Sequence, residues 1–233
     1  MTETPATLHD DYAFGAEGTH EQQVNDLVAD GMLDALVARG FLDGHRRDDW
    51  AAFRALQMQV YATFEVPVSS ITTRMARLLF AISRARQPKT IVGAGSAWGN
   101  ALVWLAGGAP QADCVGIDID PDASAVAERN FAAIGRPVTI LVEDARDVAG
   151  RLASVDLLLL DADDPETGKG ILVPILESLS PVLSRGSLVL AHDSVLPTFA
   201  DDFVAYREAV AARAAQRTMN VPIDRCGLEV TLL

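Results

Sequence analysis

From Thr90 onward, short apolar runs alternate with segments of helical periodicity, and this alternation constrains the fold more than any other feature of the chain. Runs such as TIVGAG, DCVGIDID, VTILVEDA, VDLLLLDAD and GSLVLAHDS are separated by predicted helical segments such as PDASAVAERNFAAIG and RDVAGRLA. Parallel strands need crossovers long enough to hold a helix, so the pattern predicts a mostly parallel sheet with helices on both faces. The nearly continuous runs DLLLL and SLVLA indicate strands that are buried on both sides.

The C-terminal segment NVPIDRCGLEVTLL departs from this alternation, because only a short turn separates its two apolar runs. A short turn allows an antiparallel connection and no crossover. We therefore predict a doubly wound α/β fold, with a mostly parallel seven-stranded sheet that ends in an antiparallel C-terminal hairpin.

The residues before the sheet show a different pattern. Apolar stripes at three- and four-residue steps predict helices from about Gln22, from a cap at Asp48 or Asp49, and from about Ile71. We expect three parts, which are a flexible arm (residues 1–20), an N-terminal helical extension (21–86) and a Rossmann-like sheet domain (87–233).

The chain has 233 residues and a formal net charge of −13. So acidic a chain repels phosphate backbones and anionic headgroups, which argues against a nucleic-acid or membrane partner and favours a small-molecule substrate. The two cysteines have no metal-ligand spacing, and no run resembles a signal peptide or a spanning helix. We therefore expect a cytoplasmic protein.

A glycine-rich turn follows the first strand of the predicted sheet. It runs from Gly93 through Gly95 to Gly99 and leads directly into a helix, whose free N–H groups favour an anionic ligand group. A dinucleotide site needs a small residue at the sixth position of this turn, where the chain has Trp98. The spacing argues against NAD and allows a ligand with a single carboxylate.

Carboxylates stand where the other predicted strands end. Asp118 ends the second strand, where it suits ribose hydroxyls, and Asp144 follows the third, where it suits an adenine amino group. Asp161 follows the fourth strand, and His192 and Asp193 end the fifth. The two acids after the fourth and fifth strands would repel each other, so either a cation lies between them or one of them is protonated.

The ordered motifs VGAGSAWGNALVWLA, GIDIDP, VTILVEDA, LLLDADD, LVLAHDS and VPIDRCGLEVTL resemble the S-adenosylmethionine-dependent O-methyltransferases of the catechol and caffeoyl-CoA type, over about residues 69–233. The resemblance implies the class I methyltransferase fold, S-adenosylmethionine as cofactor and a homodimer. The resemblance, the glycine-rich turn and the acids at the strand ends together predict a set of cofactor-binding residues. They are Ser70, Thr72, Gly93, Gly95, Ser96, Gly99, Asn100, Asp118, Ile119, Asp144, Ala145 and Asp161.

The resemblance also implies a site for Mg²⁺ or another hard divalent cation at Asp161, Asp193 and Ser194. The sequence departs from the pattern of this family at three positions. Gly93 replaces an acidic residue, Ser194 replaces an asparagine ligand and is a poorer ligand for a hard cation, and Asp164 replaces the catalytic lysine. One of the two lysines of the chain, Lys169, follows in a glycine-flanked loop, where we expect it to be solvated.

Two routes to an activated acceptor remain open. A metal at Asp161 and Asp193 would lower the pKa of a hydroxyl, or His192 would act as the general base. We therefore predict an S-adenosylmethionine-dependent methyltransferase with catalytic residues His192 and Asp161, which methylates a small-molecule hydroxyl in bacterial secondary metabolism. The alternative is a protein of this fold that binds S-adenosylmethionine without metal-dependent O-methylation, through N-methylation or a non-methylating role. An NAD-linked oxidoreductase is the least favoured.

Overall fold

The computed structural model describes residues 17–45, 50–67, 70–213 and 217–233. Its seven helices are α1 (Thr19–Ala38), α2 (Trp50–Thr63), α3 (Thr73–Arg86), α4 (Leu102–Gly108), α5 (Pro121–Ala133), α6 (Leu172–Leu179) and α7 (Ala200–Ala212) in this described part. Its strands there are β1 (Thr90–Ala94), β2 (Asp113–Asp118), β3 (Thr139–Val142), β4 (Val155–Leu160), β5 (Leu183–His192), β6 (Arg217–Val221) and β7 (Leu228–Leu232). The predicted caps Asp48 and Asp49 and most of the predicted arm lie outside the described residues.

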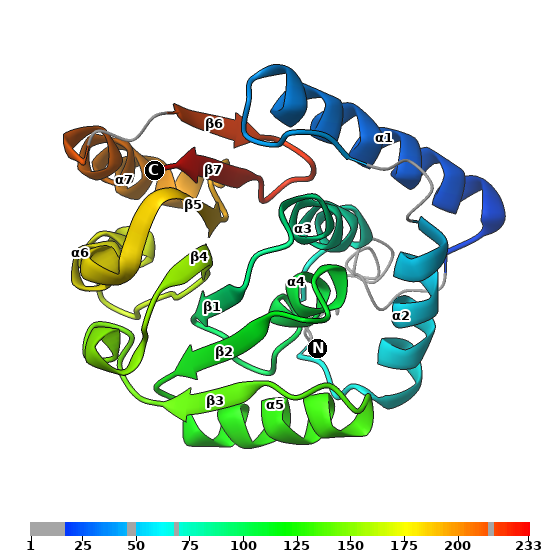
Figure 1. The fold of residues 1–233 in the computed structure, drawn as a ribbon, viewed down its shortest axis with the longest axis horizontal. Helices are drawn as coiled ribbons and strands as arrows, with labels where there is room; N and C mark the ends of the chain where they lie inside the picture. The colour runs from blue at the N-terminus through cyan, green and yellow to red at the C-terminus, as the bar shows by residue number, and fades with distance from the viewer. Residues whose placement is uncertain (1–16, 46–49, 68–69, 214–216) are drawn as a thin grey trace, which may run out of the picture.

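The strands form one sheet in the order β3-β2-β1-β4-β5-β7-β6. The first five are parallel to one another, and β7 is antiparallel to both β5 and β6 (Figure 1). The direction in which successive strands are added to the sheet reverses at β1, which pairs with β2 on one side and β4 on the other. The predicted doubly wound sheet with an antiparallel C-terminal hairpin is confirmed, and its carboxyl edge beside β1 is the place where ligands bind in such folds.

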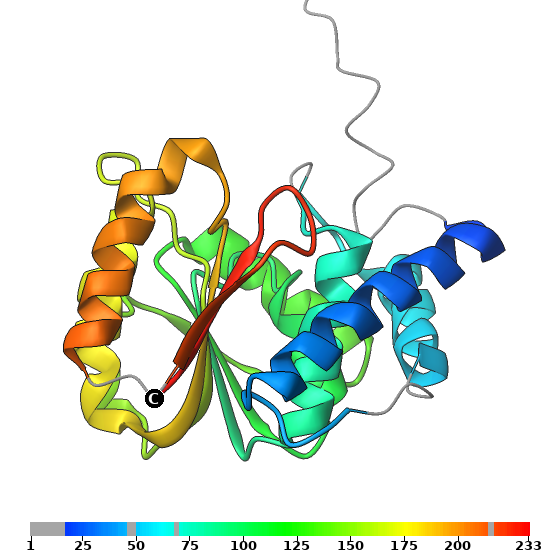
Figure 2. The same cartoon turned by 90° about the horizontal axis from the view of Figure 1, so that it is seen from above.

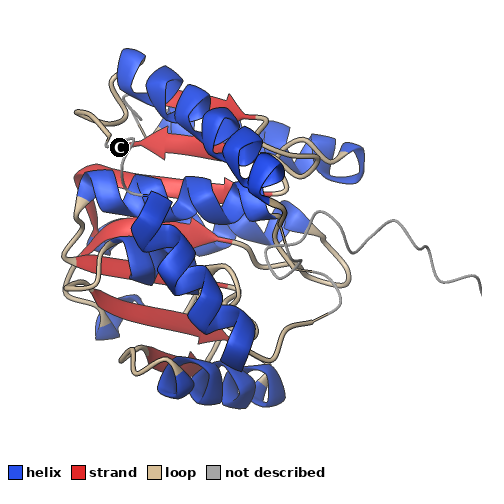
Figure 3. Ribbon diagram, turned by 90° about the vertical axis from the view of Figure 1, so that its right-hand side faces the viewer, coloured by secondary structure: helices blue, strands red, loops and turns tan. Residues whose placement is uncertain are grey.

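Helices cover both faces of the sheet, as the view along the sheet shows (Figure 2), and the strands lie side by side in one sheet (Figure 3). Helices α6 and α7 cover one face, and the apolar core on the other face includes residues of α1–α5. Successive residues of β4 alternate between these two cores, since Leu157 and Leu159 join one and Leu158 and Leu160 the other. This two-sided burial explains the continuous apolar run in the sequence.

The N-terminal helices share a core with the sheet. Phe53 of α2 packs on Trp104 of α4 with ring centroids 5.2 Å apart, and the same core includes β-strand residues such as Leu188. The buried guanidinium of Arg77 in α3 pairs with Glu17, just before α1, and with Asp26. No helix of the described residues has both the length and the apolar character required to span a membrane.

One predicted helical segment between β3 and β4 is wrong. The segment RDVAGRLA forms only the short 3₁₀ turn Ala149–Arg151. Its apolar periodicity extends over too few residues for a helix, and Gly150 in its middle lowers helix propensity. The connection therefore crosses from the carboxyl end of β3 to the amino end of β4 without an α-helix.

Candidate active site

A cavity of about 290 Å³ opens at the carboxyl ends of β1, β2, β3 and β4. Gly95 lines it after β1, Asp118 and Ile119 line it at the end of β2, and Asp144 lines it after β3. Its volume is near the lower end of the range of about 300–1,000 Å³ that small-molecule sites have. The topological switch point of the sheet therefore carries a preformed ligand cavity.

The glycine-rich turn reaches this cavity because Gly95 has no side chain. Its φ is +79°, and a Cβ there would lie only 2.4 Å from the backbone nitrogen of Ala162, in the loop after β4. Its N–H donates to the Ile117 carbonyl oxygen in β2. Only glycine accepts both the left-handed conformation and the close approach.

The two carboxylates predicted for a nucleoside lie on the cavity wall with partners of their own. Asp118 accepts hydrogen bonds from the backbone N–H groups of Ala97 at 2.8 Å and Asp120 at 3.0 Å, so it also fixes the glycine-rich turn. Asp144 pairs with Arg146, whose Nη2 lies 2.6 Å from Asp144 Oδ2. This side-chain hydrogen bond lowers the pKa of Asp144. Arg146 also lines the cavity, and no motif in the sequence pointed to it.

Next to the cavity, Asp161 and His192 meet across two neighbouring strands. Leu160 of β4 pairs with Ala191 of β5, so the next residues of the two strands fall side by side. His192 Nδ1 lies 3.1 Å from Asp161 Oδ1. The other ring nitrogen, Nε2, is buried and has no hydrogen-bond partner within the described residues. The pairing joins the two predicted catalytic residues.

Lys169 lies between the two acids, and the expectation that it is solvated is wrong. Its Nζ lies 3.0 Å from Asp161 Oδ1 and 2.9 Å from Asp193 Oδ2, and its side chain is only 2% exposed. A third contact, to the Asp161 carbonyl oxygen at 3.4 Å, uses the remaining N–H. The cation that the acid pair requires is thus supplied by the chain itself.

The loop after β4 places this lysine. Asp164 Oδ1 accepts hydrogen bonds from the backbone N–H groups of Glu166 and Thr167, and Asp164 and Gly168 form an isolated antiparallel bridge. Gly168 has a φ of +56°. The tight turn brings Lys169 back beneath the end of β4. Asp164, which stands where the resemblance implies a lysine, is a turn residue.

Neighbouring charges outweigh burial at three side chains of this cluster. Burial alone would lower the pKa of His192, but the charge and hydrogen bond of Asp161, with the charge of Asp193, outweigh burial and raise it to about 9. Burial is likewise outweighed at Lys169, whose pKa the two carboxylates raise, and at Asp161, whose pKa Lys169 and His192 lower. At neutral pH Asp161 is therefore ionised, and Lys169 and His192 are protonated.

The residues predicted to bind a divalent ion do not fit one as they stand. The ammonium of Lys169 already lies on Asp161 and Asp193, and Ser194 Oγ accepts a hydrogen bond from Asn220 at 2.7 Å. Asp193 itself adopts a φ of +70°, in the left-handed region that aspartate and asparagine enter more readily than most other side chains. Cys226 lies near His192 and Asp193, and burial raises the pKa of its thiol to about 12.

Comparison with known proteins agrees with this geometry. Residues 92–194, which run from β1 to just past β5, match the methyltransferase domain family. This central part of the chain is thus similar to a methyltransferase domain. It is 26% identical to the catechol O-methyltransferase of Mycobacterium tuberculosis over 218 residues, which cover 91% of each protein.

Solved structures show that this methyltransferase domain has the class I fold. Cofactor-bound Rv0187 from MTB has a TM-score of 0.60 at 23% identity, and the match covers 78% of this chain and 89% of that one. The O-methyltransferase TomG from Streptomyces achromogenes, solved in complex with SAM, has a TM-score of 0.62 at 20% identity, with the same coverage of both chains.

Half of the predicted cofactor-binding residues line the cavity of the methyltransferase domain. These are Gly95, Asp118, Ile119, Asp144, Ala145 and Asp161. The other six are not part of its lining and are Ser70, Thr72, Gly93, Ser96, Gly99 and Asn100. Asn100 donates to Ser70 Oγ, and Thr72 caps α3 by accepting from the Met75 N–H.

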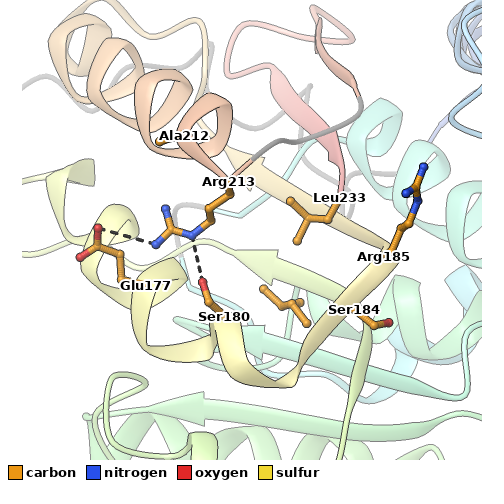
Figure 4. A pocket seen from close by; sticks show the side chains of 8 residues that line it. Glu177, Ser180, Ser184, Arg185, Ala212, Arg213 and Leu233 are labelled. Atoms are coloured by element: carbon orange, nitrogen blue, oxygen red, sulfur yellow. Dashed lines mark hydrogen bonds and ion pairs between the residues drawn. The ribbon is translucent and has the colours of Figure 1, made fainter.

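A second, larger cavity of about 750 Å³ lies away from this edge, where α6 and α7 end and β5 begins (Figure 4). Arg213 crosses it, donating to Ser180 Oγ at 2.9 Å and pairing with Glu177 at 3.6 Å. Neither the glycine-rich turn nor the strand-end acids contribute to its wall. The smaller cavity is therefore the candidate active site, because strand-end carboxylates line it and it lies at the switch point of the sheet.

Proposed function

We propose that the protein is an S-adenosylmethionine-dependent methyltransferase that methylates a hydroxyl group of a small molecule. The observation that carries the proposal is the cavity at the switch point of a methyltransferase domain, lined by Gly95, Asp118 and Asp144. Carboxylates suit ribose hydroxyls and an exocyclic amine, which are the hydrogen-bond donors of the nucleoside half of this cofactor.

The nature of the acceptor is supported by relatives. A catechol O-methyltransferase matches the chain over 91% of its length, and TomG is described as involved in tomaymycin synthesis. These names favour an aromatic or related hydroxyl as acceptor and a role in secondary metabolism. The acidic surface agrees with a small-molecule acceptor.

S-adenosylmethionine, when bound, supplies a methyl group on a positively charged sulfur. The chain's own residues then have three tasks. Asp118 and Asp144 hold the nucleoside, the Gly95 turn provides the close backbone approach, and Asp161 joins the cavity wall to the ion cluster. Alignment of acceptor oxygen and methyl carbon provides most of the rate, because methyl transfer is an in-line displacement.

His192 is the proposed general base. Its pKa of about 9 means that it holds a proton at neutral pH and accepts one only in alkaline solution. Asp161 is the proposed positioning partner, because it lines the cavity and its carboxylate contacts Nδ1, which leaves the buried Nε2 as the ring nitrogen without a hydrogen-bond partner among the described residues.

The test is a turnover assay with S-adenosylmethionine carrying a labelled methyl group and a panel of catechols and simple phenols. We expect label in an ether product and one equivalent of S-adenosylhomocysteine per product. Label recovered on nitrogen with an amine panel would replace the proposed hydroxyl acceptor, and binding of S-adenosylhomocysteine without any transfer would favour a non-methylating role.

A further inference from the structure

We infer that the ammonium of Lys169 takes the place of the divalent cation at Asp161 and Asp193, so that this methyltransferase site works without a metal. The expected metal position and the lysine compete for the same carboxylate oxygens. Lys169 is a positioning residue, since it contacts the two acids and does not itself line the cavity.

The hydrogen bonding of Lys169 is complete within the cluster. Its three N–H groups point to Asp161 Oδ1, Asp193 Oδ2 and the Asp161 carbonyl oxygen. Distances of 3.0 and 2.9 Å to the carboxylates are close to those of charge-assisted hydrogen bonds. An ammonium with all its donors used holds the acids in place as a bound ion would.

The surroundings of Lys169 also oppose exchange for a metal ion. The side chain is 2% exposed, and Nζ lies 5.9 Å from the centroid of the Phe199 ring. A metal would have to expel a buried cation whose stem is packed and whose loop is fixed by the Asp164 turn. Removing one member of a buried ion pair is strongly unfavourable.

The partners of the two acids complete the case. Among the described residues, the ion-pair contacts of Asp161 and Asp193 are made only with Lys169 and His192, and Lys169 has the shorter contact with each acid. The third expected ligand, Ser194, is hydrogen bonded to Asn220.

The decisive experiment measures Mn²⁺ binding to the full-length protein by electron paramagnetic resonance, which needs no acceptor substrate. We expect wild-type protein to leave equimolar Mn²⁺ free. Lys169→Ala removes the ammonium and its stem, so the uncompensated acids should bind Mn²⁺ at least about tenfold more tightly, equivalent to about 1.4 kcal/mol. Asp193→Asn added to Lys169→Ala should abolish this gain.

Lys89→Ala is the matched control, because Lys89 is the only other lysine of the sequence and is exposed. It should behave as the wild type. Lys169→Gln removes the charge with a smaller loss of volume, and it serves as the second variant if Lys169→Ala does not fold. Stoichiometric Mn²⁺ binding by the wild type that Asp193→Asn abolishes would overturn the inference, as would folded lysine variants that gain no affinity.

Turnover provides a second test of the Lys169 inference, separate from Mn²⁺ binding. This test rests on the proposed function. Wild-type turnover should be unchanged by exhaustive chelation. Turnover that stops with chelator and returns with Mn²⁺ would overturn the assignment of Lys169. The expected Mn²⁺ results without any turnover would support that assignment and contradict the proposed function instead.

Discussion

Asp118 has two tasks at once, because it fixes the glycine-rich turn and faces the cavity. Its two oxygens accept from the N–H groups of Ala97 and Asp120, and each oxygen retains a further lone pair. The carboxylate is thus already oriented before a ligand arrives, which lowers the entropy cost of binding.

We predict that Asp118→Ala weakens binding of S-adenosylhomocysteine by about 1–3 kcal/mol, since the ribose hydroxyls lose a charged acceptor. Titration calorimetry measures the loss. Asp122→Ala, an exposed acid one turn further along the chain, should bind like the wild type. Tight NAD binding together with no affinity for S-adenosylhomocysteine would contradict the assignment of this cavity.

His192 gives a prediction with opposite signs for stability and rate. Its pKa is about 9 in the folded protein and 6.5 ordinarily, so its contribution to the free energy of unfolding is complete below about pH 6.5 and is lost as pH rises through about 9. The rate should rise over the same range if the neutral imidazole is the base.

We therefore expect the melting temperature of the wild type to fall between about pH 6.5 and 9 while kcat/KM increases. In His192→Gln both trends should flatten, and turnover should drop at every pH. A wild-type rate that does not change over this range, with His192→Gln equally active, would remove His192 from the catalytic proposal.

At the scale of elements, the site depends on two connections, the turn after β1 and the loop between β4 and α6. The sequence predicted the first, since glycine spacing reveals a tight strand-to-helix turn. It did not reveal how the second folds. The lysine implied at Asp164 has no counterpart there, and nothing in the pattern of DADDPETGKG showed that Lys169 would return to the acids. That return depends on a side-chain turn and a long-range ion pair.

We predict that Gly95→Ala destabilises the protein by about 1–3 kcal/mol from backbone strain alone, with a further loss from overlap with the Ala162 backbone. Urea denaturation measures the difference. Gly135→Ala is the matched control, because Gly135 also has a positive φ, of +63°, but open space around its Cβ position. Equal losses in the two variants would show that close approach adds nothing at Gly95.

At the scale of the whole molecule, the order of elements was predictable and most of their contacts were not. Apolar alternation predicted the sheet, the hairpin and three N-terminal helices, all of which the structure contains. Periodicity gives a buried face but not its partner, so it did not reveal that Arg77 would be buried with Glu17 and Asp26. The adjacency of Asp161 and His192 follows from strand register, which apolar runs of this kind specify only weakly.

The exposed apolar residues of the N-terminal helices bear on the predicted homodimer. Leu27 of α1 is 67% exposed and Met58 of α2 is 68% exposed. We expect a dimer through these helices, and Leu27→Glu should shift it toward a 24.9 kDa monomer in sedimentation velocity. Val204→Glu, an exposed position on α7 on the other face of the sheet, is the control. A monomeric wild type at micromolar concentration would contradict the expectation.

The place of β1 between β2 and β4 also has a consequence for how the chain folds. Pairing Ile91 with Leu157 closes a long loop, which costs chain entropy before any contact compensates for it. The cavity takes residues from both sides of this pairing, including Asp118 and Asp161. The walls of the cavity therefore come together only when the two halves of the sheet join. During refolding, S-adenosylhomocysteine binding should appear at that late step and not at early helix formation.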